Sequence, residues 1–159
     1  MRNLKQLKTQ QGFGLVEVIV GLGIAIIVIT SLVSLAIFTL RSSLQSNLLL
    51  QGSKLANEEL EAARALRDQS TTWADFKAAM DGCLAPTKCS INTSTWEVAN
   101  VEEVLNSGTV RQLNRYFQAS YPVVGNTNII RISVSVSWNI GGQIKYAHVY
   151  SDLSNWRGN

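Results

Sequence analysis

Few side chains in this sequence are placed to do chemistry. Glu17 is the only charged residue within the apolar run 13–38. A carboxylate in hydrocarbon is costly, so its presence there suggests a specific role. Cys83 and Cys89 are the only cysteines and are separated by five residues, a spacing that allows a small disulfide loop or two free thiols. His148 is the only histidine.

These residues do not combine into a catalytic centre. His148 falls within a predicted strand, where we expect a structural side chain rather than a base. The sequence contains no phosphate-binding loop, nucleophile elbow or cluster of metal ligands. Two thiolates and one distant histidine fall short of the four ligands of a structural zinc site. We therefore expect no enzyme, no catalytic residue, no cofactor and no metal site.

The basic residues are unevenly distributed. Residues 1–12 hold Arg2, Lys5 and Lys8 and no acid, which accounts for the whole net charge of +3. The remaining segment balances 11 basic against 11 acidic residues, so strong nucleic-acid binding is not expected. Lys and Arg beside an apolar span tend to stay in the cytoplasm. We expect a cytoplasmic N-terminus and an exported C-terminal part.

The predicted export of the C-terminal part affects the expected oxidation state of the two cysteines. An oxidising compartment favours a disulfide between Cys83 and Cys89. The alternative is two free thiols in a surface loop.

The apolar run predicts a helix that spans a membrane. It exceeds the 18 or so apolar residues that suggest a span, and in lipid only a helix pairs every backbone group within the segment. We assign residues 13–40 to this span. A helical pattern then continues over residues 41–69, with charged residues on the opposite side and Gly52 as the likeliest weak point. The apolar stripe that defines this amphipathic half includes Leu40, Leu44, Leu48, Leu55, Ala62 and Leu66.

Residues 70–159 form the predicted head. Apolar and polar residues alternate over 130–140, which predicts a strand with one buried face. The Gly141-Gly142 pair predicts a tight turn into a partner strand. Further predicted elements are a short helix at 73–80 and strands at 112–118 and 143–150. An antiparallel sheet with one apolar face needs a cover, which the amphipathic helix supplies, so we predict an α+β fold.

The N-terminal residues resemble those of the type IV prepilin family. The short basic leader ends in Gly12, and the sequence Phe13-Gly14-Leu15-Val16-Glu17 opens the apolar run. The resemblance covers residues 1–68 and implies a class III signal peptide at 1–12 and the pilin fold. Gly14 stands where Thr or Ser is usual in the family, and the proline often found midway along the apolar segment is absent.

Several expectations follow from this resemblance. It implies cleavage by prepilin peptidase between Gly12 and Phe13, followed by N-methylation of Phe13. It also implies an assembly role for Glu17, which could neutralise the Phe13 amine of a neighbouring subunit. The alternative for Glu17 is a carboxylate near the helix N-terminus that snorkels to the head groups. The implied partners are the peptidase, other pilin subunits that pack through the N-terminal helix, and the inner-membrane assembly platform.

The resemblance thus implies a structural subunit, a minor one, of a type IV pilus or a related filament. The single small cysteine loop and the ending around Trp156 resemble minor pilins or pseudopilins. We expect a single-pass protein of the inner membrane that later enters an extracellular pilus or a periplasmic filament. One alternative is a type II secretion pseudopilin or a DNA-uptake pilin; Asp152 is the lone acid near the C-terminus, which disfavours the calcium site of the secretion rival. Another is a signal-anchored extracytoplasmic binding domain, which would keep its leader.

Overall fold

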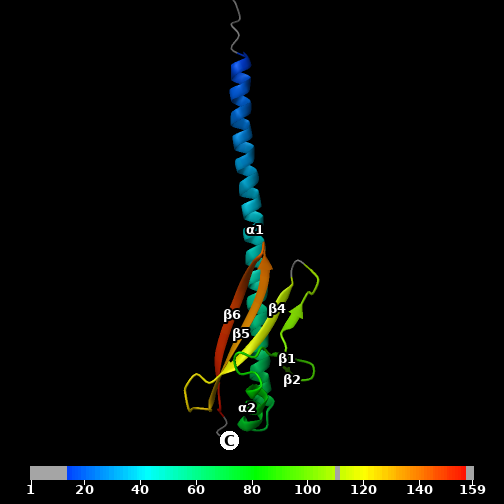
Figure 1. The fold of residues 1–159 in the computed structure, drawn as a ribbon, viewed down its shortest axis with the longest axis vertical. Helices are drawn as coiled ribbons and strands as arrows, with labels where there is room; N and C mark the ends of the chain where they lie inside the picture. The colour runs from blue at the N-terminus through cyan, green and yellow to red at the C-terminus, as the bar shows by residue number, and fades with distance from the viewer. Residues whose placement is uncertain (1–13, 110–111, 157–159) are drawn as a thin grey trace, which may run out of the picture. The chain divides into compact units, whose positions relative to one another are not determined.

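The computed structural model describes residues 14–109 and 112–156. The predicted cleavage site at Gly12 and Phe13 lies outside these residues. The chain divides into two compact units, residues 1–43 and 44–159, which are described in turn. Helix α1, Gly14–Gln69, begins in the first unit and ends in the second (Figure 1).

In the first unit, α1 consists of exposed apolar residues. The most apolar 18-residue window of α1 has a mean hydropathy of 2.7, and none of it is buried within the chain. By length and composition α1 is a candidate membrane span, as predicted for residues 13–40.

Helix α1 continues through Gly52 without a break, so this glycine is not the weak point that the sequence suggested. Gly52 is buried in the second unit, where it faces Trp138 and Ala147. A Cβ atom at Gly52 would lie 2.8 Å from Trp138 Cζ3 and 3.2 Å from Ala147 Cβ. The glycine therefore allows the helix and the sheet to approach closely, and packing against the indole offsets its low helix propensity.

The second unit contains a four-stranded antiparallel sheet in the order β3-β4-β5-β6 (Figure 1). Its strands are β3 Glu103–Leu105, β4 Leu113–Ser120, β5 Ile129–Ile140 and β6 Gln143–Ser154. The three predicted strands are confirmed, but β6 extends four residues beyond its predicted end at Tyr150, and β3 was not predicted. Together with α1, this sheet confirms the predicted α+β fold and its pilin-like arrangement.

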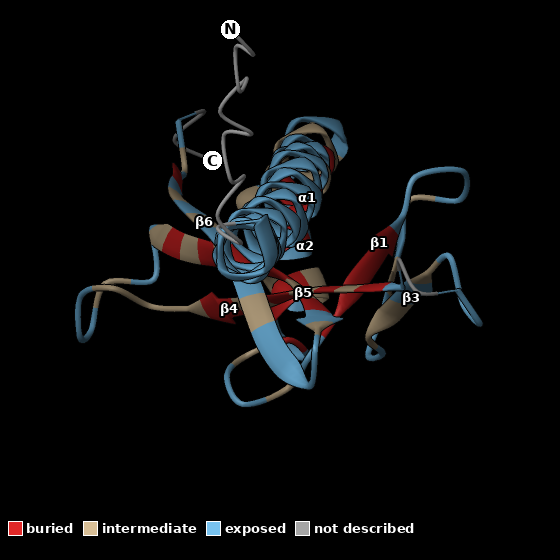
Figure 2. Ribbon diagram, turned by 90° about the horizontal axis from the view of Figure 1, so that it is seen from above, coloured by how far each residue is buried: buried red, intermediate tan, exposed pale blue. Residues whose placement is uncertain are grey.

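Alternation along the strands decides which face is buried. On β4 the buried residues occupy every second position from Leu113 to Ala119. On β5 every second residue from Ile130 to Trp138 is buried as well, and Ser135 between them is also buried. The apolar residues among them pack with a stripe of α1 that includes Leu48, Ala56 and Leu60. In Figure 2 the buried residues, in red, gather on β1, β4 and β5.

The β5–β6 turn uses the backbone freedom of glycine. Gly141 and Gly142 have φ angles of 59° and 82°, in the left-handed region that a two-residue hairpin turn of type I′ requires. Residues Ile140 and Gln143 pair directly on either side. The predicted turn is confirmed.

The remaining elements connect α1 to β3. The predicted short helix is α2, Trp73–Asp81, which begins with a capping box between Thr72 and Asp75 and buries Phe76 and Met80. Strands β1, Ser90–Asn92, and β2, Glu97–Ala99, form a separate two-stranded sheet that was not predicted.

Candidate assembly interface

The first part of α1 presents an unusually apolar surface. Every large apolar side chain from Leu15 to Leu40 is between 47% and 73% exposed. A contiguous apolar surface of this extent marks a membrane or protein interaction site in a folded chain. Nothing in the described part of the chain covers it.

The hydroxyl groups of this segment are compatible with hydrocarbon. Thr30, Ser31, Ser34 and Thr39 each donate a hydrogen bond to the backbone carbonyl four residues earlier, at 2.7–2.9 Å. Such bonds satisfy the hydroxyls inside the helix, so they can enter lipid or an apolar bundle without losing a partner.

The glycines of this segment lie in open space. A Cβ atom added at Gly14, Gly21 or Gly23 would meet no heavy atom within 4 Å. None of them is needed for packing within the described chain, unlike Gly52. Small residues on an apolar helix let a neighbouring helix approach its backbone closely.

Glu17 is the single carboxylate of this surface. It lies in the first turn of α1 and is exposed, and it makes no ion pair within residues 14–109 and 112–156. The partial positive charge of the helix N-terminus favours a carboxylate there. The Phe13 amine, its predicted partner in a neighbouring chain, and the cleavage site at Gly12 lie outside the described residues. Cleavage, methylation and pairing therefore stay predictions.

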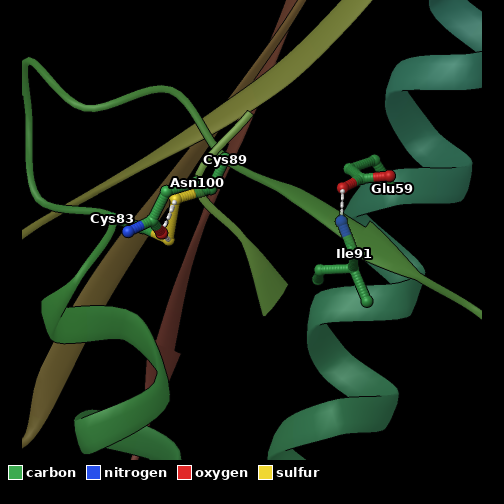
Figure 3. Close-up of a disulfide and its surroundings, with 5 residues drawn as sticks. All are labelled: Glu59, Cys83, Cys89, Ile91 and Asn100. Atoms are coloured by element: carbon green, nitrogen blue, oxygen red, sulfur yellow. Dashed lines mark hydrogen bonds between the residues drawn. A yellow bond between two sulfur atoms is a disulfide. The ribbon is translucent and has the colours of Figure 1, made fainter. Parts of the chain in front are cut away.

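A second carboxylate on α1, Glu59, was not predicted to matter. Its side chain is fully buried against the sheet. Glu59 Oε1 accepts a hydrogen bond from the backbone N–H of Ile91 at 2.7 Å (Figure 3). Its other oxygen, Oε2, lies 3.2 Å from Arg115 Nε on β4. The carboxylate therefore ties α1 to β1 and to the main sheet at once.

Arg115 joins Glu59 to a second acid. Its guanidinium donates to Glu103 Oε2 on β3, with a distance of 2.9 Å from Nε and a shorter bond from Nη2. Burial raises the pKa of Glu59, although the positive charge of Arg115 acts in the opposite direction. A buried ion of this kind is tolerated only with good partners, so the three residues act as one structural unit.

The sequence did carry a signal for this cluster. Glu59 lies seven residues from both Gly52 and Leu66, on the apolar stripe of the helix. Arg115 interrupts the apolar positions of β4 between Leu113 and Phe117. Two opposite charges, each at a position that should be buried, predict a buried pair.

The predicted disulfide between Cys83 and Cys89 is present and fully buried. Its loop lies along β4, because Cys89 and Phe117 exchange backbone hydrogen bonds at 3.0 and 2.7 Å. The side-chain oxygen of Asn100 lies 3.2 Å from Cys89 Sγ (Figure 3). The loop thus covers the part of the β4 edge that the short strand β3 leaves open.

His148 lies on the exposed face of β6. Its Nδ1 is 2.8 Å from Ser135 Oγ on the paired position of β5. No carboxylate hydrogen-bonds to this imidazole within the described residues, so the pair lacks the third group that orients a catalytic histidine. The same residues contain no group of three or more side chains suited to hold a metal ion. That the protein is not an enzyme stays a prediction.

We found no match to this chain among protein-family models, curated proteins or solved structures. The family resemblance therefore rests on the N-terminal residues and on the pilin-like arrangement of helix and sheet.

Proposed function

We propose that this protein is a structural subunit of a type IV pilus or a related filament. Its leader is removed between Gly12 and Phe13, and its N-terminal helix then packs with the helices of other subunits. The head folds by itself and is displayed on the filament. Before assembly the chain spans the inner membrane once, with its N-terminus in the cytoplasm.

The observation that carries this proposal is a single carboxylate within the exposed apolar surface of the first part of α1. The apolar side chains from Leu15 to Leu40 have no partner within the described chain, and they surround one carboxylate, Glu17. A lipid span alone explains the apolar surface. It does not explain an acid in the first turn, directly after a Gly-Phe junction and a basic leader.

Processing is the first test. The full-length chain is produced in its host, with and without the prepilin peptidase, and its N-terminus is determined by mass spectrometry. We expect a chain that starts with N-methylated Phe13 only where the peptidase is present. A chain that starts at Met1 in both cases would instead support a signal-anchored extracytoplasmic domain.

The second test concerns Glu17. Glu17→Ala and Glu17→Val should still be cleaved but should reduce incorporation into sheared filaments by at least about tenfold, as expected when a charge in hydrocarbon loses its partner. Glu58→Ala is the matched control, because Glu58 is an exposed carboxylate on the same helix within the head. Equal incorporation of the Glu17 and Glu58 variants would contradict the pairing of Glu17 with a neighbouring amine.

The location of the assembled subunits separates the remaining alternatives. Long extracellular filaments support a pilus. Short filaments confined to the periplasm, with loss of protein secretion on deletion, support a pseudopilin of a type II secretion system. Loss of transformation alone supports a DNA-uptake pilin.

A further inference from the structure

The two edges of the main sheet differ in how far they are covered. At one edge, β3 has only three residues, and the loop closed by Cys83 and Cys89 lies along the rest of β4. At the other edge, β6 has 12 residues and pairs with β5 along its whole length without a bulge. Within the described residues, no backbone hydrogen bond joins residues 143–152 to any element other than β5. The second edge is therefore long, regular and open.

The register of the β5–β6 hairpin decides which backbone groups face this open edge. Ile140 and Gln143 flank a two-residue turn and pair directly, so they exchange both backbone hydrogen bonds. Hydrogen-bonded pairs recur at every second residue, which leaves the N–H and C=O of the intervening β6 residues directed outward. These five residues, which we call the β6 edge, have exposed side chains and are Ile144, Tyr146, His148, Tyr150 and Asp152. They form a row about 27 Å long, at about 3.4 Å per residue.

On the outer face of the sheet, the β6 edge is flanked by apolar and aromatic side chains. Ile144, Tyr146 and Tyr150 are 59–63% exposed. Asp152 is the charged residue of the five, and it is paired with Arg131, which also lies over the Tyr150 ring. Aromatic and β-branched side chains pair well with such neighbours across two strands. This flank therefore suits an uncharged strand face.

On the inner face, the β6 edge is flanked by a lysine. Lys145 pairs with Trp138, the residue whose ring faces Gly52 of α1, and its side chain is half-buried. Lys145 makes no ion pair within residues 14–109 and 112–156. Farther along this flank, Arg64 of α1 donates to Ser151 Oγ at 3.1 Å. A strand added beside β6 would cover Lys145 further, which is costly unless that strand brings an acid.

The lysine also argues against a second copy of β6 as the occupant. The inner-face residues beside the β6 edge contain no acid; they are Lys145, Ala147, Val149 and Ser151. Two copies of β6 paired edge to edge would therefore leave both lysines without a counter-charge. Inward-pointing charges protect open sheet edges from unselective pairing in this way, and they select a strand of complementary charge.

We propose that the β6 edge binds an extended strand of a partner protein by β-strand addition. An extended backbone is the ligand that complements an alternating row of donors and acceptors. The partner strand carries an acid opposite Lys145 and β-branched or aromatic residues opposite Tyr146 and Tyr150. This binding is an addition to the filament role and does not depend on it.

A synthetic peptide probe tests the proposal. Its sequence is Thr-Val-Thr-Val-Thr-Val-Thr-Glu-Thr, so antiparallel pairing along residues 144–152 places its glutamate opposite Lys145 and its valines on the α1 side. The full-length chain in detergent is titrated into the fluorescently labelled probe, and the anisotropy of the probe is measured. We expect saturable binding below about 0.1 mM. No saturable binding in this range overturns the proposal.

Two methylated forms of the probe separate backbone pairing from side-chain contact. N-methylation of the fifth residue removes the N–H that faces His148, and it should weaken binding by at least about tenfold. N-methylation of the sixth residue blocks an N–H that points away from β6, so binding should change by less than about twofold. Equal effects of the two methyl groups would contradict strand addition.

Substitutions of His148 repeat this test on the chain itself. His148→Pro removes an N–H of the β6 edge without removing a bond to β5, and it should weaken binding by at least about tenfold. His148→Ala is the matched control, because it loses the same contact with Ser135 but keeps the N–H, and it should bind within about twofold of wild type. Denaturant unfolding checks that both variants are folded, and Tyr146→Pro with Tyr146→Ala replaces the pair otherwise. Equal binding by a folded proline variant and its alanine control overturns the proposal.

A charge exchange tests the selectivity that Lys145 provides. Lys145→Glu should bind the probe at least about fivefold more weakly than wild type, and it should prefer a probe in which lysine replaces the glutamate. The same preference in wild type and variant would overturn the predicted acid. A dimer of the chain in detergent that His148→Pro abolishes and His148→Ala retains would assign the β6 edge to a second copy and also overturn the proposal.

Discussion

Two carboxylates on one helix show how the two units of this protein differ. Glu59 is buried and has partners within its own chain: its Oε1 accepts a hydrogen bond from the Ile91 N–H, and its Oε2 forms an ion pair with Arg115. Glu17 stands in an apolar surface and makes no ion pair within the described residues. The glycines repeat the contrast, because Gly52 is in close contact with Trp138 whereas Gly21 faces open space. Within the described residues, the head thus covers its own acid and its own glycine, whereas the first part of α1 leaves Glu17 and its apolar side chains exposed.

The largest expected effect comes from replacing each of the two acids by alanine in separate variants. Glu59→Ala should lower the free energy of unfolding of the head by about 2–4 kcal/mol, because it leaves the buried Ile91 N–H without its acceptor and removes one of the two carboxylates that face Arg115. Glu17→Ala should leave the free energy of unfolding of the head unchanged. Denaturant unfolding of the full-length chain in detergent, followed by tryptophan fluorescence, measures this, since all four tryptophans lie in residues 44–159. Equal losses in both variants would remove the distinction between the two units.

The disulfide should matter for the head alone. Replacing Cys83 and Cys89 by serine should lower the free energy of unfolding of the head by about 2–3 kcal/mol, the loss expected for a loop of this length. Processing at the leader should be unaffected. The wild-type protein unfolded under reducing conditions is the control and should match the variant. A processing defect in the variant would show that the two units are coupled.

Substitutions of Gly52 and Gly21 should have a smaller effect on the stability of the head. Gly52→Ala should destabilise the head by about 1–3 kcal/mol, because the new Cβ collides with the Trp138 ring. Gly21→Ala, in open space, should change the unfolding of the head by less than about 0.5 kcal/mol. The double variant Gly52→Ala, Trp138→Phe tests the cause, since the smaller ring should remove most of the penalty of the alanine. Purely additive losses would contradict a direct contact.

The smallest effect is a pH dependence. Because the pKa of Glu59 is raised in the folded state, folding favours its protonated form, and its contribution to stability falls as the pH rises from its ordinary value of 4.5 through the raised one. The side chain in Glu59→Gln cannot titrate. As the pH rises over this range, the free energy of unfolding of the wild type should therefore fall relative to that of the variant. Arg115 and Glu103 face Glu59 and remain in both proteins. A difference that is constant with pH would show that Glu59 does not titrate there.

Regular patterns explain why much of the fold was predictable. The apolar run, the amphipathic stripe and the alternation from Ile130 to Ile140 each extend over many residues, so local errors average out. The three-residue strands β1, β2 and β3 carry no such pattern, and they were missed. Gly52 was misread for a related reason: its low helix propensity is a local property, whereas its contact with Trp138 joins residues far apart in the sequence.

The sequence by itself determined the apolar helix, the isolated Glu17, the position of the cysteines and the α+β class, because charge, hydropathy and periodicity act through neighbours along the chain. Only the tertiary structure decided that Glu59 meets both the Ile91 N–H and Arg115, and that Gly52 lies against Trp138. These features depend on which strands pair and how they register with the helix. A local pattern can indicate that a position is buried, but which residue contacts it depends on residues that are distant in the sequence.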